Sequence, residues 1–312
     1  MHPERYRALF TAALMTAAAS ISFAQAPAPD PLVKENATTK LAPHTYAISD
    51  GNVPLVPNVG IIVGTRAALV VDPGLGKRNG EAVMRELRKL TPATEIYVTA
   101  THFHAEHTTG YAAFSAPAKF ISSSIQEAEF AEGGAQQIQL FSGRSPMTAE
   151  LLRGAGAPKV DIRFDREYQL DLGGVRVRFI VVGPTHTKGD TAIFVEGDNV
   201  LFAGDVVMNN SFLAATATSS MKAWLTAFDT LEKLRATVIV PSHGPIGDAS
   251  LIPLNRSVML GIQTRTRELK KMGQSADDAA ATVQKELQAK YPNWPRANGI
   301  VAAARSAYAE AP

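Results

Sequence analysis

The sequence contains no cysteine. This absence excludes disulfide bonds, cysteine-ligated zinc, thiolate-held iron–sulfur clusters and a thiol nucleophile. An excess of charge is also missing, because 31 Lys and Arg residues face 29 Asp and Glu residues, which leaves a formal net charge of +2. No basic run stands out, so we expect no nucleic-acid partner and no electrostatic membrane patch.

The first 24 residues have the pattern of an export signal. Two arginines near the start are followed by an apolar, alanine-rich run from Leu9 to Phe23 without any charge, and small residues stand at Ser22 and Ala24. This pattern predicts a cleavable signal peptide over residues 1–24. The alternative is an uncleaved membrane anchor, for which the run is short. We therefore expect a periplasmic or secreted protein with no stable membrane insertion after cleavage.

The rest of the chain divides by composition and hydrophobic periodicity. Residues 25–43 are rich in Pro, Ala and Thr and predict a flexible lead-in. Two β-rich halves follow, each accompanied by helical patterns, and together they indicate an α/β sandwich. We expect this domain over residues 44–250, and a helical extension over residues 251–312. The predicted strands are 67–72, 94–101, 167–172, 175–182, 191–196, 199–205 and 236–241, and the predicted helices are 78–90, much of 122–158, and 219–235.

Histidine is scarce but clustered: five of the seven histidines fall in three short segments. Each segment follows a predicted strand, and a further strand ends in a carboxylate. These residues are His102, His104, Glu106 and His107, then His186, then Asp205, and finally His243. An extended backbone points His102 and His104 to the same face. If the strand ends meet, five imidazoles and two carboxylates converge. The isolated His44 is expected to be an ordinary surface or core residue and not a ligand.

Such a concentration of bases and acids needs a cation to hold it together. Imidazole and carboxylate without thiolate suit zinc, and also iron, manganese or cobalt. Structural zinc sites usually contain cysteine, which this chain lacks, so the pattern favours a two-metal hydrolytic site.

At these residues the chain resembles the metallo-β-lactamase superfamily, over roughly residues 44–250. The family hallmark is His-x-His-x-Asp-His, then a distal His, a bridging Asp and a final His, and the same order occurs here. The resemblance implies a four-layer αββα sandwich and zinc, with two ions per chain. It assigns His102, His104 and His186 to the first metal, Glu106, His107 and His243 to the second, and Asp205 to a bridge between them. It also makes Asp72 the acid that orients a ligand imidazole.

Two positions depart from the β-lactamase pattern. Glu106 stands where the family usually has Asp, and its longer side chain either binds the second metal differently or only supports it. Asp205 replaces the Cys or Ser typical of β-lactamases and is more like the thioesterase, lactonase and phosphodiesterase branches. The usual lysine three residues later is Met208.

The implied activity is that of a zinc-dependent hydrolase. Two metals would lower the pKa of a bound water from about 16 to near neutrality and provide a hydroxide nucleophile, with Glu106 or Asp205 as the catalytic acid–base residues that orient it and accept its proton. The expected substrate is a small ester, lactone, thioester or lactam. One alternative is a metallo-β-lactamase acting on β-lactam antibiotics. A second is a non-catalytic metal-binding accessory protein of an exported redox pathway.

Substrate specificity is expected to depend on the loops, and the sequence identifies only candidate residues for the pocket walls. Candidate pocket residues are Phe130, Phe141, Met147, Met208, Asn209, Asn210 and Phe212. Lys188 is a candidate contact for an anionic substrate, although a solvated loop lysine is the more common situation, and Ser242 is expected to be a turn residue. The aromatic residues Tyr291, Trp294 and Tyr308 are expected to cover the sheet or to form a dimer contact.

Overall fold

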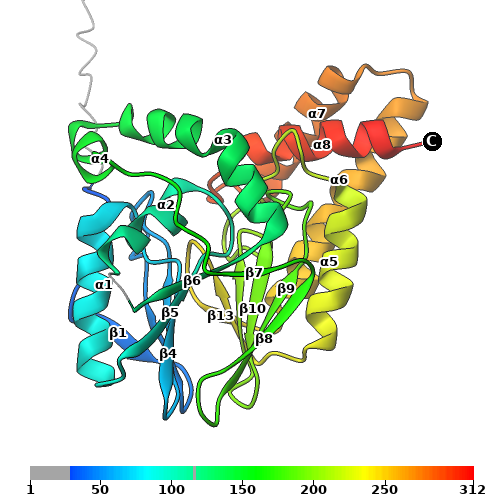
Figure 1. The fold of residues 1–312 in the computed structure, drawn as a ribbon. Coiled ribbons are helices and arrows are strands. Elements are labelled where there is room, and N and C mark those ends of the chain that lie inside the picture. The colour runs from blue at the N-terminus through cyan, green and yellow to red at the C-terminus, as the bar shows by residue number, and fades with distance from the viewer. Residues whose placement is uncertain (1–28, 115–116) are drawn as a thin grey trace, which may run out of the picture.

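The computed structural model describes residues 29–114 and 117–312. Two β-sheets lie face to face, with helices on both outer sides, so the predicted four-layer αββα sandwich is confirmed (Figure 1). Helix α1 (Gly76–Leu90) covers one sheet, and α5 (Met221–Lys233) and α6 (Leu251–Lys271) cover the other. The predicted signal peptide lies outside the described residues and stays a prediction.

The first sheet has seven strands and the second has six. In spatial order the first sheet contains β1 (Thr38–Lys40), β2 (Thr45–Ile48), β3 (Val59–Val63), β4 (Ala67–Val71), β5 (Glu95–Thr99), β6 (Lys119–Ser123) and β7 (Ile162–Phe164). The second contains β13 (Gly247–Asp248), β12 (Val238–Pro241), β11 (Val200–Gly204), β10 (Thr191–Val195), β9 (Arg176–Val181) and β8 (Glu167–Asp171). The parallel pairs are β4–β5, β5–β6, β6–β7 and β11–β12.

Strand β4 shows how the layers are held together. All five of its residues are buried, because both faces of the sheet are covered. Ala68 and Val70 belong to the cluster beneath α1, whereas Leu69 and Val71 point between the two sheets. This alternation follows the two-residue period of a strand. The same logic makes a continuous apolar run the sequence signature of a central strand.

Helix α5 anchors the loop that follows β11. Its apolar side chains recur at helical spacing, with Trp224, Phe228 and Leu231 fully buried against the second sheet. The side chain of Ser220 caps the helix by accepting a hydrogen bond from the backbone of Ala223. The indole of Trp224 donates to the carbonyl oxygen of Val206 at 2.9 Å. The backbone next to Asp205 is thereby fixed to the helix layer.

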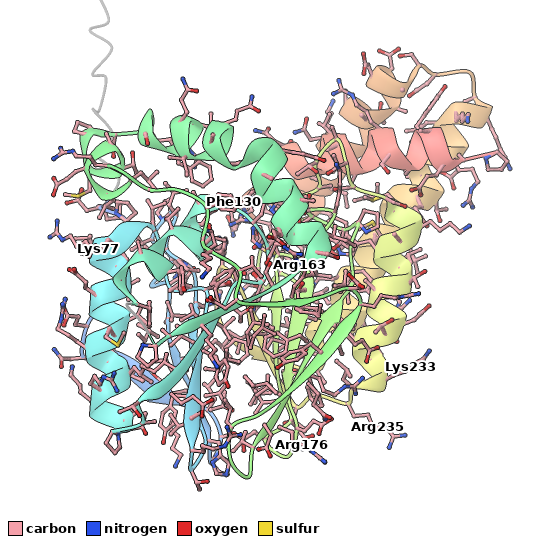
Figure 2. All side chains as sticks on the ribbon, viewed as in Figure 1. Lys77, Phe130, Arg163, Arg176, Lys233 and Arg235 are labelled. Atoms are coloured by element: carbon pink, nitrogen blue, oxygen red, sulfur yellow. The ribbon has the colours of Figure 1, made fainter. Side chains whose placement is uncertain are left out.

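The remaining helices lie at the periphery. They are α2 (Ala105–Thr108), a 3₁₀ turn (Thr109–Ala113), α3 (Ser124–Ser142), α4 (Pro146–Leu151), α7 (Ala276–Lys290) and α8 (Asn298–Glu310). The extra C-terminal helices α6, α7 and α8 are present, and α8 packs against α6 and α7 next to α5 (Figure 1). Figure 2 shows Phe130 of α3 directed towards the interior, whereas Lys77 of α1 and Lys233 of α5 project outwards.

Two sequence-based expectations differ from the structure. The described part of the lead-in, residues 29–43, is packed rather than flexible: Val33 is buried and β1 pairs with β2. The reason is Asn79 of α1, whose side chain bonds the backbone of Val33 and Pro31. Strands β6 and β7 were also not anticipated, and the helical pattern predicted from residue 122 begins two residues later. Both strands are short and get their hydrogen bonds from neighbours distant in the sequence.

Among the described residues, no helix is both long enough and apolar enough to cross a membrane.

The contribution of the Asn79 side chain to stability can be tested with a single substitution. Replacing it in Asn79→Ala leaves the buried N–H of Val33 and the carbonyl of Pro31 without their partner, which should reduce the free energy of unfolding by about 1–3 kcal/mol. Urea denaturation measures this loss, and amide hydrogen exchange should increase at residues 32–35. The exposed neighbour Lys34→Ala is the control and should behave as wild type. Equal stability of the Asn79 and Lys34 variants would contradict the assignment.

Candidate metal centre

The residues singled out in the sequence meet at one edge of the sandwich. As predicted, they follow strand ends: Asp72 follows β4, the segment from His102 follows β5, and Asp205 follows β11 directly. The loops after β9 and β12 bring His186 and His243. A strand end places a side chain at the sheet edge without burying it between the sheets, which leaves polar atoms pointing into a shared space.

The first group of possible ligands consists of His102, His104 and His186. Their candidate ligand atoms all lie within 4.8 Å of one another. The Nδ1 of His104 lies 3.1 Å from Nε2 of His102 and 3.3 Å from Nε2 of His186. Three ring nitrogens therefore converge on one point, which is the arrangement that a tetrahedral metal site requires.

The opposite ring nitrogens of this group are occupied elsewhere. The Nδ1 of His186 contacts the carbonyl oxygen of Ala214, so this nitrogen carries the proton and Nε2 is left as the acceptor. The Nδ1 of His102 lies 3.1 Å from the hydroxyl of Thr101, whose own proton is donated to Asp72. The lone pairs of Nε2 in His102 and His186 are consequently available for a cation.

The second group consists of Glu106, His107 and His243, again with ligand atoms within 4.8 Å of one another. The short helix α2 presents Glu106 and His107 together, and Nε2 of His107 lies 3.8 Å from Oε1 of Glu106. The Nδ1 of His243 bonds the carbonyl oxygen of Val56 at 2.9 Å, which directs Nε2 into the site. The glutamate therefore reaches the second group despite its extra methylene.

Asp72 connects the two sheets at this edge. It adopts a left-handed backbone conformation with φ of 54°, which is uncommon for a residue with a side chain. Its carboxylate accepts from the backbone N–H and the hydroxyl of Thr101 at 2.7 and 2.9 Å, and from the hydroxyl of Ser242 at 3.2 Å. It also lies 3.0 Å from Nδ1 of His107. Ser242, expected to be a turn residue, thus also positions this acid.

Asp205 has a partner for which the sequence contains no signal. Its Oδ2 lies 3.7 Å from Nε2 of His186 and 2.8 Å from Nη1 of Arg296, a residue between α7 and α8. Asp205 belongs to neither group of converging ligand atoms, so the bridging role stays a prediction. Arg296 was missed because nothing in the local pattern of the C-terminal helices connects it to a residue 91 positions earlier.

Burial and charge determine the protonation of the cluster. Burial and the neighbouring imidazoles hold the pKa of His102 and of His104 well below the usual range, and burial lowers the pKa of His243 to about 3. These three rings are neutral at pH 7, which is the form that binds metal. For His107 burial is outweighed by the carboxylate of Asp72, and the pKa is raised to about 9.

The two acids of the site respond in opposite directions. Burial raises the pKa of the Glu106 carboxyl. Burial acts in the same sense on Asp205, but Arg296 outweighs it and holds the pKa of Asp205 well below its usual range. Asp205 therefore carries its negative charge at neutral pH, with Arg296 as its counterion.

The donor set fits divalent metal ions. Oε2 of Glu106, Nε2 of His107 and Oδ1 of Asp205 are buried and have no hydrogen-bond partner among the described residues. Burying a polar atom without a hydrogen-bond partner is energetically costly. A bound cation would supply the missing partner of each of these three atoms. Imidazole nitrogens and carboxylate oxygens suit zinc. The residues present could therefore hold two such ions, one at each group.

A cavity of about 820 Å³ opens over this edge. Four candidate ligands and Asp205 line it, together with loop residues from several parts of the chain. Of the pocket residues predicted from sequence, Phe141, Met208, Asn209 and Asn210 do line this cavity. Met147 and Phe212 instead pack within apolar clusters, and Phe130 is buried edge-on against Phe103. The sequence could not separate these two sets, because both are apolar or amide residues in predicted loops and helices.

The other sequence candidates lie outside this cavity. Lys188 borders a smaller neighbouring pocket and pairs with Glu132 at 3.3 Å. Tyr291 and Trp294 stack with ring centroids 4.2 Å apart and pack against Phe212. They pack against the apolar cluster of the helix layer beside the second sheet. The expected cover over the sheet and the dimer contact both stay predictions.

The role of the Asp72 carboxylate can be tested with a single substitution. In Asp72→Asn the backbone conformation is tolerated, but the charge that holds Nδ1 of His107 is lost. Zinc affinity, measured by competition with a chromogenic chelator, should fall roughly 10- to 100-fold. Asp198→Asn, in the turn between β10 and β11, is the control because its contacts lie with His44 and Thr45. Unchanged affinity in the Asp72 variant would show that this carboxylate does not orient the ligand.

Solved structures with the same fold support the architecture. A metallo-β-lactamase from Pontibacter korlensis superposes with a TM-score of 0.57 at 22% identity, covering 72% of this chain and 98% of that one. A metallo-β-lactamase family protein from Thermus thermophilus gives a TM-score of 0.60 at 20% identity, covering 87% and 94%. The stereoselective inverting sec-alkylsulfatase Pisa1 from Pseudomonas sp. gives 0.63 at 16% identity, covering 88% of this chain but 50% of its own.

The sequence comparison leads to the same family. The model of the Metallo-beta-lactamase superfamily matches residues 52–243, which span the site from the loop before β3 to the final histidine. This segment is more than half of the chain and contains all seven predicted metal-site residues. The chain therefore belongs to the metallo-β-lactamase superfamily.

Proposed function

We propose that this protein is a zinc-dependent hydrolase that holds two ions per chain and acts on a small ester, lactone, thioester or lactam. The observation that carries the proposal is the pair of adjacent ligand groups at the floor of one cavity. A structural metal site is closed, whereas a catalytic one borders a space for substrate and water. Here His104 and Glu106, one from each group, line the cavity itself.

In the proposed assignment each metal has its own set of residues. His102, His104 and His186 hold the first ion, Glu106, His107 and His243 hold the second, and Asp205 lies beside the first set. Two bound zinc ions supply a nucleophile from water at neutral pH and polarise the carbonyl group of the substrate.

The protein contributes orientation and proton transfer. Three of the imidazole rings are held at the nitrogen that faces away from the site. Asp72 holds His107, the carbonyl oxygen of Val56 holds His243, and that of Ala214 holds His186, so the rings need little reorganisation when metal ions bind. Glu106 and Asp205 are the carboxylates at the cavity floor, and we assign them the positioning of water and the acceptance of its proton.

The proposal is tested first by metal content and turnover. Elemental analysis of the purified protein should give two zinc ions per chain. A panel of a 4-nitrophenyl ester, a lactone, a thioester and the chromogenic β-lactam nitrocefin should contain a substrate whose hydrolysis stops with dipicolinate and returns with zinc. Activity that survives complete metal removal would refute the proposal. Two metals without turnover of any substrate would instead support the accessory-protein alternative.

His104→Ala provides the matched variant for this experiment. Nδ1 of His104 lies within 3.3 Å of Nε2 in both other members of the first group, so the loss of His104 should remove metal and activity together. A decrease in turnover of at least about 100-fold is expected when a metal ligand is lost. His44→Ala is the control, since His44 is exposed and contacts only the carbonyl oxygen of Val63 through its ring. Full zinc content in His104→Ala would exclude His104 as a ligand.

Glu106 is tested by its own pair of variants. Glu106→Gln keeps the shape but loses the charge, so the chain should bind about one zinc ion instead of two. Glu106→Asp shortens the acid and should preserve the fold while changing the affinity for the second ion. Glu127→Gln, an exposed residue of α3 paired with Arg163, serves as the control. A zinc titration of Glu106→Gln identical to wild type would leave Glu106 as a supporting residue only.

A further inference from the structure

Arg296 brings a positive charge to the cavity from outside the family match. It lies between α7 and α8, beyond residues 52–243, and its Nη1 donates to Oδ2 of Asp205 at 2.8 Å. Its side chain is 31% exposed and lines the cavity together with His186, whereas Asp205 is nearly fully buried. One side of this guanidinium thus contacts the floor of the site, and the rest is accessible from the cavity.

The backbone holds Arg296 in this place. Its φ of 65° lies in the left-handed region, which is unfavourable for a residue with a side chain and is maintained only by surrounding contacts. Two contacts are evident: the carbonyl oxygen of Pro295 accepts from Phe212, and that of Arg296 accepts from Gly299. At Gly299 a Cβ would lie 2.1 Å from the carbonyl oxygen of Leu213, so α8 begins tightly against the loop after β11. Arg296 is therefore directed into the site by packed structure.

The guanidinium of Arg296 has N–H donors left with which to bind an anion. A guanidinium has five N–H donors, and among the described residues Asp205 is the one hydrogen-bond acceptor for this side chain. Metal ions near Asp205 would compete for its negative charge and weaken its hold on Arg296. The remaining acid of the cavity wall, Asp50, already accepts from the backbone of Asn52 and Gly244. A ligand with its own negative charge is the complement that the cavity lacks.

The cavity lining also contains a second cation and an apolar surface. The guanidinium of Arg144 lies over the ring of Phe141, 4.3 Å from its centroid, and Phe141 in turn contacts His104 with centroids 6.3 Å apart. Leu140, which is 59% exposed, and Leu55 line the same cavity. The cavity lining thus combines apolar side chains with two guanidinium groups, those of Arg144 and Arg296.

We propose that Arg296 binds an anionic group of the substrate, a carboxylate or a sulfonate-like oxyanion, so that the enzyme acts on acyl compounds with an aliphatic body and a negative charge. This inference rests on the proposed hydrolase function and specifies its substrate class. In this assignment Arg296 binds the anionic group of the substrate, so its effect should fall mainly on recognition.

Direct binding tests the proposal without relying on turnover. The probes are hexanoate, hexanesulfonate and the neutral hexanamide, titrated calorimetrically into the zinc-loaded full chain. Wild type should bind the anions more tightly than the amide, and R296Q should reduce the ratio of anion to amide affinity about 10- to 100-fold. R296K keeps the charge but not the planar fork, and its ratio should fall only about three- to tenfold. Comparing hexanoate with hexanesulfonate distinguishes the two oxyanions.

Controls separate Arg296 from the metals. Zinc content is measured for every variant, because Arg296 also contacts Asp205. R305Q removes an exposed arginine of the same C-terminal extension, paired with Asp277, and should keep the wild-type ratio. An anion held by zinc alone would bind R296Q and R296K as it binds wild type, which would overturn the proposal. So would equal affinity of wild type for the anions and the amide.

Turnover distinguishes this inference from the hydrolase proposal. The substrates are mono-4-nitrophenyl adipate and its methyl ester, which differ by one negative charge. Wild type should prefer the anionic ester in kcat/KM, mainly through KM, and R296Q should bring the two esters closer together. Hydrolysis without charge preference would refute the role of Arg296 and leave the hydrolase intact. No hydrolysis of either ester, together with the expected binding ratios, would support the anion site and count against ester hydrolysis.

Discussion

The contact of Asp72 with Thr101, Ser242 and His107 is the interaction on which the site depends. Asp72 ends β4 in the first sheet, whereas Ser242 follows β12 in the second, so one buried carboxylate joins the edges of both sheets. Its contact with Nδ1 of His107 leaves Nε2 of that ring facing the site. A buried carboxylate is stable only with partners. The contacts of Asp72 therefore fix the relative position of the two sheet edges together with the orientation of the His107 ring.

The same edge gathers groups that do not satisfy one another. Neutral imidazoles, a carboxyl group with a raised pKa in Glu106 and unpartnered atoms of His107 and Asp205 lie in a small volume. A bound cation would compensate for this burial, and metal affinity would then be coupled to folding. The edge of the sandwich therefore presents ligand atoms whose missing partner would be a cation from solution. Arg296 supplies part of that compensation for Asp205, from a helical extension beyond the family match.

Much of the fold could be predicted from the sequence, and the failures have a common cause. The strands 67–72 and 199–205 and the helix at 219–235 were evident because central strands and amphipathic helices have a local period. Strands β6 and β7 and the packed segment around Val33 were not evident. Their stability comes from hydrogen bonds to partners far along the chain, such as Asn79, and a local pattern contains no information about those.

The sequence by itself determined the chemistry of the site: its histidines and acids, their order, the absence of thiolate and the position of each after a strand. Only the tertiary structure decided which nitrogen of each ring faces inwards, that Glu106 reaches the second group, and that Arg296 contacts Asp205. The physical reason is that residue type fixes which atoms can donate or bind. Direction and distance depend on backbone groups such as the carbonyls of Val56 and Ala214, which only the folded chain brings alongside the rings.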